Sequence, residues 1–318
     1  MPRLRPLLLL PSDLDAADLL SRQPASEFVA ADLPERPPLL DPILSSNSLA
    51  LLYGPRGLGK SFLALGIAWA AAAGTSFLGW RASRPHRVLY VDGEMAAGDL
   101  KRRLLLFGAP PDTLEIMQAD RQAGGLPDLG CVEGLCRLMA SWGMPELVVL
   151  DNLSSLAGVT GGDFGGWTDL QRFLIKQRQL GRALLLVHHA NKKGEQRGTS
   201  RREDVLDIVM ALRRPADYRP RQGARFEIHF EKTRGLYGEA TEPIEARLET
   251  DVQGVARWSW RAAGQSNLER VAGLLKAGLS AARAARLLGL SRSRGYQLRD
   301  EAISSGLLAS AEASEADA

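Results

Sequence analysis

The chain has 318 residues, of which 45% are hydrophobic and 24% are charged, and this composition excludes fibrous and wholly disordered proteins. The formal net charge is only +3, so the total charge says little about a nucleic-acid partner. Two cysteines are too few for a disulfide scaffold or a four-cysteine zinc site. The apolar run at residues 7–10 is too short for a signal peptide or a membrane span, so we expect a cytoplasmic protein with no membrane partner.

Short apolar segments alternate with helical patterns as far as residue 204. The predicted strands are residues 49–53, 87–91, 113–117, 147–150 and 183–187, and the predicted helices include residues 61–73, 132–142 and 167–179. This alternation predicts an α/β fold with a mainly parallel sheet covered on both faces. Four later segments alternate with period two and predict strands, antiparallel in part, that extend the sheet: residues 208–212, 225–231, 244–248 and 255–260.

A glycine-rich loop follows the first of these strands. Residues 54–61 read G-P-R-G-L-G-K-S and fit G-x-x-x-x-G-K-[ST], with a strand before the loop and a helix after it. Lys60 is expected to reach the β- and γ-phosphates of ATP, and the Ser61 hydroxyl to bind Mg²⁺. The residues expected to contact the nucleotide are Gly54, Pro55, Arg56, Gly57, Leu58, Gly59, Lys60, Ser61 and Phe62.

Acidic side chains end two other predicted strands. Asp151 ends the run L-V-V-L-D, where a carboxylate that helps hold Mg²⁺ belongs. The residue after it is Asn152 rather than a catalytic glutamate, so the base must lie elsewhere. Glu94, in V-D-G-E after the second strand, shares the carboxyl edge of the sheet and can orient the attacking water. Asp92 competes for this role, and a solvated loop carboxylate is the alternative.

Two adjacent histidines follow the strand at residues 183–187 on the same edge. His188 and His189 are interpreted as nucleotide contacts that sense the γ-phosphate. A purely structural pair and a metal site are the alternatives, but neighbouring residues of an extended chain point to opposite faces, which disfavours a shared metal.

Together these motifs resemble RecA-like P-loop ATPases (AAA_25-like), and more narrowly the plasmid RepA-type hexameric replicative helicases. The resemblance rests on G-P-R-G-L-G-K-S, V-L-Y-V-D-G-E, L-V-V-L-D-N-L, L-V-H-H-A-N-K, R-G-T-S and E-K-T-R-G. It implies a homo-oligomeric, hexameric ring in which Lys232 and Arg234, the K-x-R of the last motif, reach a neighbouring subunit's γ-phosphate as catalytic groups. A solvated pair of side chains at a strand end is the alternative.

The resemblance also implies that the segment after the histidines contacts single-stranded DNA. Its candidate contacts are Lys192, Lys193, Arg197, Arg201 and Arg202. No aromatic side chain for base stacking lies among them, and a plain solvated loop is the alternative.

The last helical region resembles helix-turn-helix and winged-helix modules of bacterial regulators. Ser280 and Ser291 are predicted N-caps, and Arg292, Arg294 and Arg299 lie on the third helix, which suits a DNA major groove. A protein-interaction bundle is the alternative.

We therefore predict an N-terminal arm (residues 1–45), a RecA-like ATPase domain (46–262), a helix-turn-helix domain (267–306) and an acidic disordered tail (307–318). The predicted function is Mg²⁺-dependent ATP hydrolysis coupled to DNA, as in a plasmid or mobile-element replicative helicase or translocase. An ATP-switched DNA-binding regulator and a recombination or replication-initiation accessory without unwinding activity are the alternatives.

Overall fold

A computed structural model describes residues 22–33, 35–157, 167–190, 204–215, 218–251, 254–263, 267–288 and 290–309. The chain divides into residues 1–36 and residues 37–318. In the first unit, helix α1 (Ala25–Ala30) has no buried residue. Among its described helices, the chain has none that is both long enough and apolar enough to cross a membrane.

The boundary of the N-terminal arm lies earlier than the sequence predicts. Residues 38–45 form a small antiparallel pair, β1 (Pro38–Leu40) and β2 (Leu44–Ser45). The side chains of Leu39, Leu40, Ile43 and Leu44 are buried in the main core. Burial of four large aliphatic side chains holds these residues in the second unit rather than in the arm.

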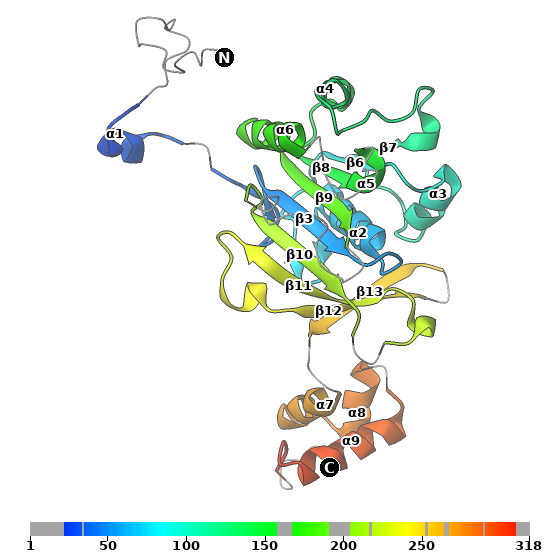
Figure 1. The fold of residues 1–318 in the computed structure, drawn as a ribbon. Helices are drawn as coiled ribbons and strands as arrows, with labels where there is room; N and C mark the ends of the chain where they lie inside the picture. Colours follow the sequence, from blue (N-terminus) through cyan, green and yellow to red (C-terminus); the bar gives the residue numbers. More distant parts are fainter. Residues whose placement is uncertain are drawn as a thin grey trace, which may run out of the picture. The chain divides into compact units, whose positions relative to one another are not determined.

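The second unit is built on a nine-stranded sheet with the order β13-β12-β11-β10-β3-β9-β8-β6-β7 within the described residues (Figure 1). Its six parallel strands, from one side to the other, are β10 (Ile208–Arg213), β3 (Leu49–Gly54), β9 (Ala183–His189), β8 (Leu147–Asp151), β6 (Val88–Asp92) and β7 (Leu114–Gln118). The antiparallel extension is β11 (Arg225–Thr233), β12 (Ile244–Thr250) and β13 (Ala256–Ala262). This strand order confirms the expected mainly parallel α/β sheet. Buried aliphatic runs form such strands, which need cover on both faces.

Helices cover both faces of the parallel part. One core joins the sheet to α2 (Lys60–Ala73), α3 (Ala97–Leu105) and the hairpin β4 (Ser76–Phe77) with β5 (Trp80–Arg81). The other core joins the opposite face to α4 (Val132–Ser141), α5 (Leu153–Leu156) and α6 (Trp167–Gln179). Because alternate residues of each strand enter opposite cores, the polar residues at the strand ends are fixed in direction by the packing behind them.

Three helices follow the sheet: α7 (Asn267–Lys276), α8 (Ala281–Leu287) and α9 (Arg292–Ser304). They share a small core that includes Val271 and Leu298. Both predicted N-caps are confirmed, since the hydroxyls of Ser280 and Ser291 each accept a hydrogen bond from the backbone N–H three residues later, that of Arg283 and of Arg294. A Cβ at Gly295 would lie 2.6 Å from the Ala285 side chain, so small residues set the close approach of α8 and α9.

Candidate active site

The site forms where four parallel strands end at one edge of the sheet. Asp92, the last residue of β6, lies in register with Asp151, the last residue of β8. On the neighbouring strands, Gly54 of β3 lies beside His189 of β9. The topology therefore brings together the motif residues that are separated by up to 135 positions along the chain (189 minus 54).

The glycine-rich loop joins β3 to the N-terminus of α2. Gly59, directly before this helix, has φ +109°, and a Cβ there would lie 3.0 Å from the Phe226 ring. Only glycine fits this left-handed, crowded position without strain. The loop thus delivers Lys60 and Ser61 at a helix N-terminus, where backbone N–H groups and the helix dipole favour phosphate.

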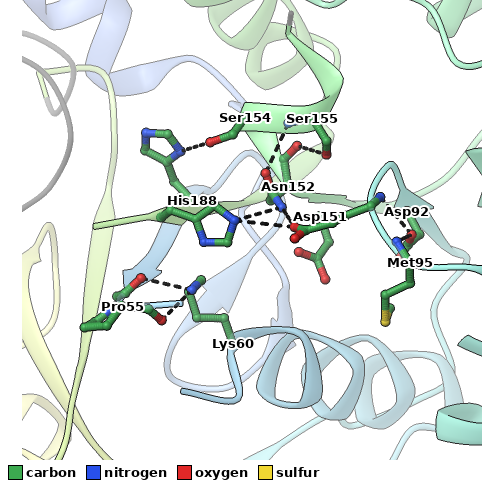
Figure 2. A network of polar contacts seen from close by, with 12 residues as sticks. Pro55, Lys60, Asp92, Met95, Asp151, Asn152, Ser154, Ser155 and His188 are labelled. Carbon is green, nitrogen blue, oxygen red and sulfur yellow. Dashed lines mark hydrogen bonds and ion pairs between the residues drawn. The ribbon is translucent and has the colours of Figure 1, made fainter. Parts of the chain in front are cut away.

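Lys60 is buried at the first position of α2. Its Nζ donates hydrogen bonds to the carbonyl oxygens of Gly54 (2.9 Å) and Pro55 (2.8 Å) (Figure 2). Burial lowers the pKa of Lys60 to about 8, against the raising effect of Asp151 and Glu94. The ammonium group is therefore held in place and charged at neutral pH.

Asp151 is almost fully buried and accepts a hydrogen bond of 2.5 Å from the Tyr90 hydroxyl. Burial raises the pKa of Asp151, while hydrogen bonds from Tyr90 and Ser61 lower it. Ser61 and Asp151 thus lie in contact, and hydroxyl and carboxylate oxygens are ligands that suit Mg²⁺.

Asp92 is a second buried carboxylate beside this oxygen pair. Its Oδ1 accepts hydrogen bonds from the backbone N–H groups of Glu94 (3.1 Å) and Met95 (2.8 Å). Its Oδ2 is buried and has no hydrogen-bond partner among the described residues. Burial raises the pKa of Asp92 to about 6. An orphaned oxygen next to Asp151 fits a site that receives a cation, so the residues present fit Mg²⁺.

Glu94 lies in the loop after β6 with its side chain 57% exposed. Its carboxylate accepts a hydrogen bond from the side-chain amide of Asn152 and lies 3.4 Å from His189 Nε2. The Asn152 amide nitrogen is also 3.3 Å from the same histidine nitrogen. Burial, then the nearby Lys60, lowers the pKa of His189. The neutral imidazole, the amide and the carboxylate therefore form one polar cluster.

Glu94 and His189 line a cavity of ≈ 460 Å³. Among the residues predicted from the sequence, those lining it are Arg56, Gly57, Gly59, Lys60, Ser61, Phe62, Glu94, Asp151 and His189. Lining residues with no predicted contact role are Met95, Ala96, Asp99, Arg103 and Ala224; Asp92, weighed as an alternative base, also lines it. Glu94 and residues of the glycine-rich loop thus line the same cavity.

Not every predicted nucleotide contact faces this cavity. His188 is buried, and its Nδ1 lies 3.3 Å from the Ser154 hydroxyl of α5 (Figure 2). Strand alternation explains why only one histidine of the pair lines the cavity. Leu58 is buried in the core, while Gly54 and Pro55 contribute carbonyl oxygens to Lys60.

Lys232 and Arg234 lie at the other edge of the sheet. β11 runs antiparallel to β10, and Thr233 pairs with Ile208, which in turn lies beside Ala50 at the start of β3. This edge is opposite the carboxyl ends that carry the cavity. The two residues are therefore not brought to the nucleotide loop of their own chain.

The predicted DNA contacts fall in two groups. Lys192, Lys193, Arg197, Arg201 and Arg202 lie outside the described residues. On α9, Arg294 pairs with Glu301 (3.0 Å) and Arg299 with Asp300 (2.9 Å). Arg292 and Arg299 also lie over the ring of Tyr296, so the α9 surface carries arginines held by its own side chains.

Residues of the site that had no role assigned from the sequence also include Tyr90, Asn152 and Arg103. Tyr90 bonds Asp151, Asn152 bonds Glu94, and the Arg103 guanidinium lies 4.5 Å from the centre of the Phe62 ring. The Tyr90 contact could have been predicted from the sequence, because alternation places Tyr90 of β6 and Asp151 of β8 on the same face of the sheet. The contacts of Asn152 and Arg103 depend on tertiary packing.

The model of the family AAA_25, described as an AAA domain, matches residues 16–195. This is more than half of the chain, and it contains the glycine-rich loop, Glu94, Asp151 and the histidine pair. The chain belongs to the AAA_25 family. It has a P-loop ATPase core, in which residues 54–61 are the glycine-rich loop.

Relatives of this AAA_25 chain include proteins named DNA repair protein RadA. That of Mycobacterium tuberculosis strain H37Rv is 29% identical over 199 residues, which cover 57% of this chain and 37% of the relative. That of Brucella abortus is 26% identical over 183 residues, which cover 52% of this chain and 33% of the relative. The chain thus matches only about a third of the length of these relatives.

Two solved structures are similar to the AAA_25 chain. A KaiC-like protein of Pyrococcus horikoshii has 17% identity and a TM-score of 0.46, with 70% of this chain and 99% of the other covered. The flagellar accessory protein FlaH of Methanocaldococcus jannaschii has 13% identity and a TM-score of 0.46, with 67% and 90% covered.

Proposed function

We propose that this AAA_25 protein is a Mg²⁺-dependent ATP hydrolase that acts on DNA as a homo-oligomeric ring, and most specifically a replicative helicase or DNA translocase of the plasmid RepA type working in the cytoplasm. The observation that carries the ATPase part is the cavity in which Glu94 faces Lys60, Ser61 and Asp151. That set supplies a base, a phosphate-binding cation and oxygen ligands within one site.

In this proposal the γ-phosphate lies between the glycine-rich loop and Glu94. Lys60 donates to the β- and γ-phosphates and neutralises part of their charge. Glu94 accepts the proton of the attacking water, and its bond from Asn152 fixes the direction of the carboxylate. His189 contacts the Asn152 amide and the Glu94 carboxylate, and it reports the loss of the γ-phosphate to the chain beyond β9. Ser61 and Asp151 hold Mg²⁺, which neutralises charge on the phosphate oxygens when bound.

A ring completes the site from a second subunit. Arg234 is 53% exposed at the sheet edge opposite its own nucleotide loop, so it can stabilise charge on the transferring phosphoryl group only of another chain. Lys232 on the same strand end is proposed to assist in the neighbouring site. This placement supports a homo-oligomer, proposed as a hexamer, with active sites between subunits.

The action on DNA is proposed from three sources. The name of the RadA relatives associates them with DNA repair. Basic residues of the segment 191–202 are proposed to follow the backbone of single-stranded DNA. Arg292, Arg294 and Arg299 of α9 are proposed to contact duplex DNA as part of a helix-turn-helix. The three-helix unit with its arginine-bearing α9 also favours the second candidate function, an ATP-switched DNA-binding regulator or accessory ATPase without unwinding activity.

Steady-state ATP turnover with and without single-stranded DNA tests the proposal, together with strand displacement on a forked duplex. If the protein is a helicase, DNA stimulates ATP turnover and Glu94→Gln abolishes strand displacement. ATP-dependent duplex binding without displacement would support the regulator instead. Absence of any ATP hydrolysis would overturn both.

A further inference from the structure

A buried carboxylate joins three elements at the sheet edge that carries Arg234. Asp207 directly precedes β10 and is 3% exposed. Its Oδ2 accepts a hydrogen bond of 2.9 Å from the backbone N–H of Leu49, the first residue of β3. Its own backbone N–H donates to the Leu49 carbonyl oxygen at 2.7 Å. The carboxylate is therefore fixed to the start of the strand that leads to the nucleotide loop.

Two guanidinium groups converge on the other carboxylate oxygen. Arg234 Nη1 lies 3.6 Å and Arg178 Nη1 lies 3.8 Å from Asp207 Oδ1. The backbone N–H of Arg234 also donates to the Asp207 carbonyl oxygen at 2.7 Å, and Arg234 Nη2 donates to the Asp204 carbonyl oxygen at 3.4 Å. Arg178 lies in the last turn of α6, and Arg234 directly follows β11. One buried negative charge thus attracts two cations from different elements.

We propose that Asp207 is a positioning residue that holds Arg234 ready for the active site of the neighbouring subunit. The inference rests on the proposed function, in which Arg234 acts on a second chain. An exposed arginine moves among many rotamers, and ordering it at the moment of reaction opposes catalysis. A fixed carboxylate at the base of the side chain orders the guanidinium beforehand.

The geometry of the contacts suits a group that must also leave. Separations of 3.6 and 3.8 Å are longer than those of a bidentate arginine–carboxylate pair. Arg178 lies near the same oxygen, so its charge already neutralises part of the carboxylate and weakens the attraction for Arg234. The side chain of Arg234 is 53% exposed, whereas that of Asp207 is 5% exposed. Asp207 therefore directs Arg234 without enclosing it, and a γ-phosphate with greater charge can draw the guanidinium away.

The contacts of Asp207 with Leu49 have a second consequence. Leu49 begins β3, whose last residue, Gly54, begins the phosphate-binding loop of the same chain. Asp207 thus ties the group proposed to act on the neighbour to the strand that carries the chain's own nucleotide. A shift of β3 would move the anchor of Arg234 directly, because both contacts are hydrogen bonds to the backbone.

Asp207→Asn is the informative variant. The asparagine oxygen can still accept the Leu49 N–H, while the charge that orients the guanidinium is lost. We expect kcat for ATP to fall about 10-fold, within the loss that a displacement of about 1 Å produces, with KM for ATP unchanged because the nucleotide loop is intact. Glu249→Gln, which removes an exposed carboxylate paired with Arg247 on β12, is the matched control and should keep full activity.

A double-mutant cycle separates positioning from a general structural role. If Asp207 acts through Arg234, Asp207→Asn should reduce kcat in the wild-type background and change it less than 2-fold in an Arg234→Ala background. Equal losses in both backgrounds, or a rise in KM with an unchanged kcat, would overturn the positioning role. Circular dichroism and oligomer size by light scattering must match the wild type; should Asp207→Asn fail to assemble, the cycle is run with Asp207→Glu, which keeps the charge and displaces it.

The same variants distinguish failure of this inference from failure of the proposed function. Subunits with Arg234→Ala are mixed with subunits with Lys60→Ala, so that intact loops meet intact arginines only across an interface. Recovery of ATP turnover on mixing, together with loss in each variant alone, is expected for action on a neighbour. If Arg234→Ala alone is fully active, the proposed role of Arg234 is wrong; if only Asp207→Asn is fully active, the positioning role is wrong and that of Arg234 stands.

Discussion

Asn152 donates a side-chain hydrogen bond to the carboxylate of Glu94 across the ends of two neighbouring strands, β8 and β6. The same asparagine caps α5 through its Oδ1, which accepts the Ser155 backbone N–H at 3.2 Å. One side chain therefore both starts a helix and directs the residue proposed to activate water.

Replacing Asn152 by Asp should separate these two tasks. The aspartate oxygen keeps the helix cap, but it cannot donate to Glu94 and repels the carboxylate. We expect the Tm to change little and kcat for ATP to fall by about 10- to 100-fold, a part of the 10²–10⁴-fold that a positioned base contributes. Steady-state turnover and thermal unfolding measure the two effects. A large loss of Tm with normal specific activity of the folded fraction would contradict the assignment.

Glu94→Gln should retain nucleotide binding and lose hydrolysis. The glutamine keeps the shape and an acceptor oxygen but cannot take a proton, so we expect kcat to fall at least about 10²-fold with the Kd for an ATP analogue within about 2-fold of the wild type. Fluorescence titration and turnover assays give both numbers. Glu115→Gln, an exposed carboxylate on the adjacent strand β7, is the matched control. If Glu94→Gln were active and Asp92→Asn inactive, Asp92 would be the base.

Asp92 should make the apo protein less stable as the pH rises. Burial raises its pKa to about 6 from an ordinary 3.8, so folding favours the protonated form. The stabilisation is complete below pH 4 and is lost as the pH rises through about 6. At about 1.36 kcal/mol per pKa unit, the free energy of unfolding should fall by up to roughly 3 kcal/mol across this window. Urea unfolding without Mg²⁺ measures it, and Asp92→Asn should remove this part of the slope; an unchanged slope in the variant would show that another group titrates.

Lys60 should give nucleotide binding a pH limit on the alkaline side. Its pKa is lowered to about 8 by burial, so the free protein loses the ammonium charge above that pH. A bound γ-phosphate favours the charged form, and affinity for a non-hydrolysable ATP analogue should therefore fall above pH 8 by up to about tenfold per pH unit. Calorimetric titration between pH 7 and 9.5 measures this. A Lys60→Arg variant, whose charge persists, should show no such decline; an equal decline would assign it to another group.

The fold and the site differ in how much of each could be predicted from the sequence. The parallel strands follow from buried runs such as L-V-V-L-D, and their shared carboxyl edge correctly placed Glu94, Asp151 and His189 beside Lys60. His188 faces Ser154 rather than the cavity. The sequence predicts a strand that ends at residue 187, whereas β9 continues to His189, so alternation along the strand turns the two histidines to opposite faces. The bond from Asn152 to Glu94 and the ion pairs of Asp207 join residues from different elements, and no local pattern encodes them.

The arginines of α9 provide a test of the proposed DNA contact. Arg292 and Arg299 lie over the Tyr296 ring, at 5.8 and 5.0 Å from its centre, and this stacking holds two cations on one helix surface. If they contact phosphates, Arg292→Ala and Arg299→Ala should each weaken duplex DNA binding by the full-length protein and reduce the slope of log K against log salt by about 0.9. Fluorescence anisotropy between 50 and 200 mM salt measures the slope. Arg257→Ala, an exposed arginine paired with Asp251 on the sheet, is the control and should leave the slope unchanged. A variant that loses a phosphate contact releases fewer counterions on binding, so its slope must change. Unchanged slopes in both α9 variants would therefore favour a protein-interaction role for the three helices.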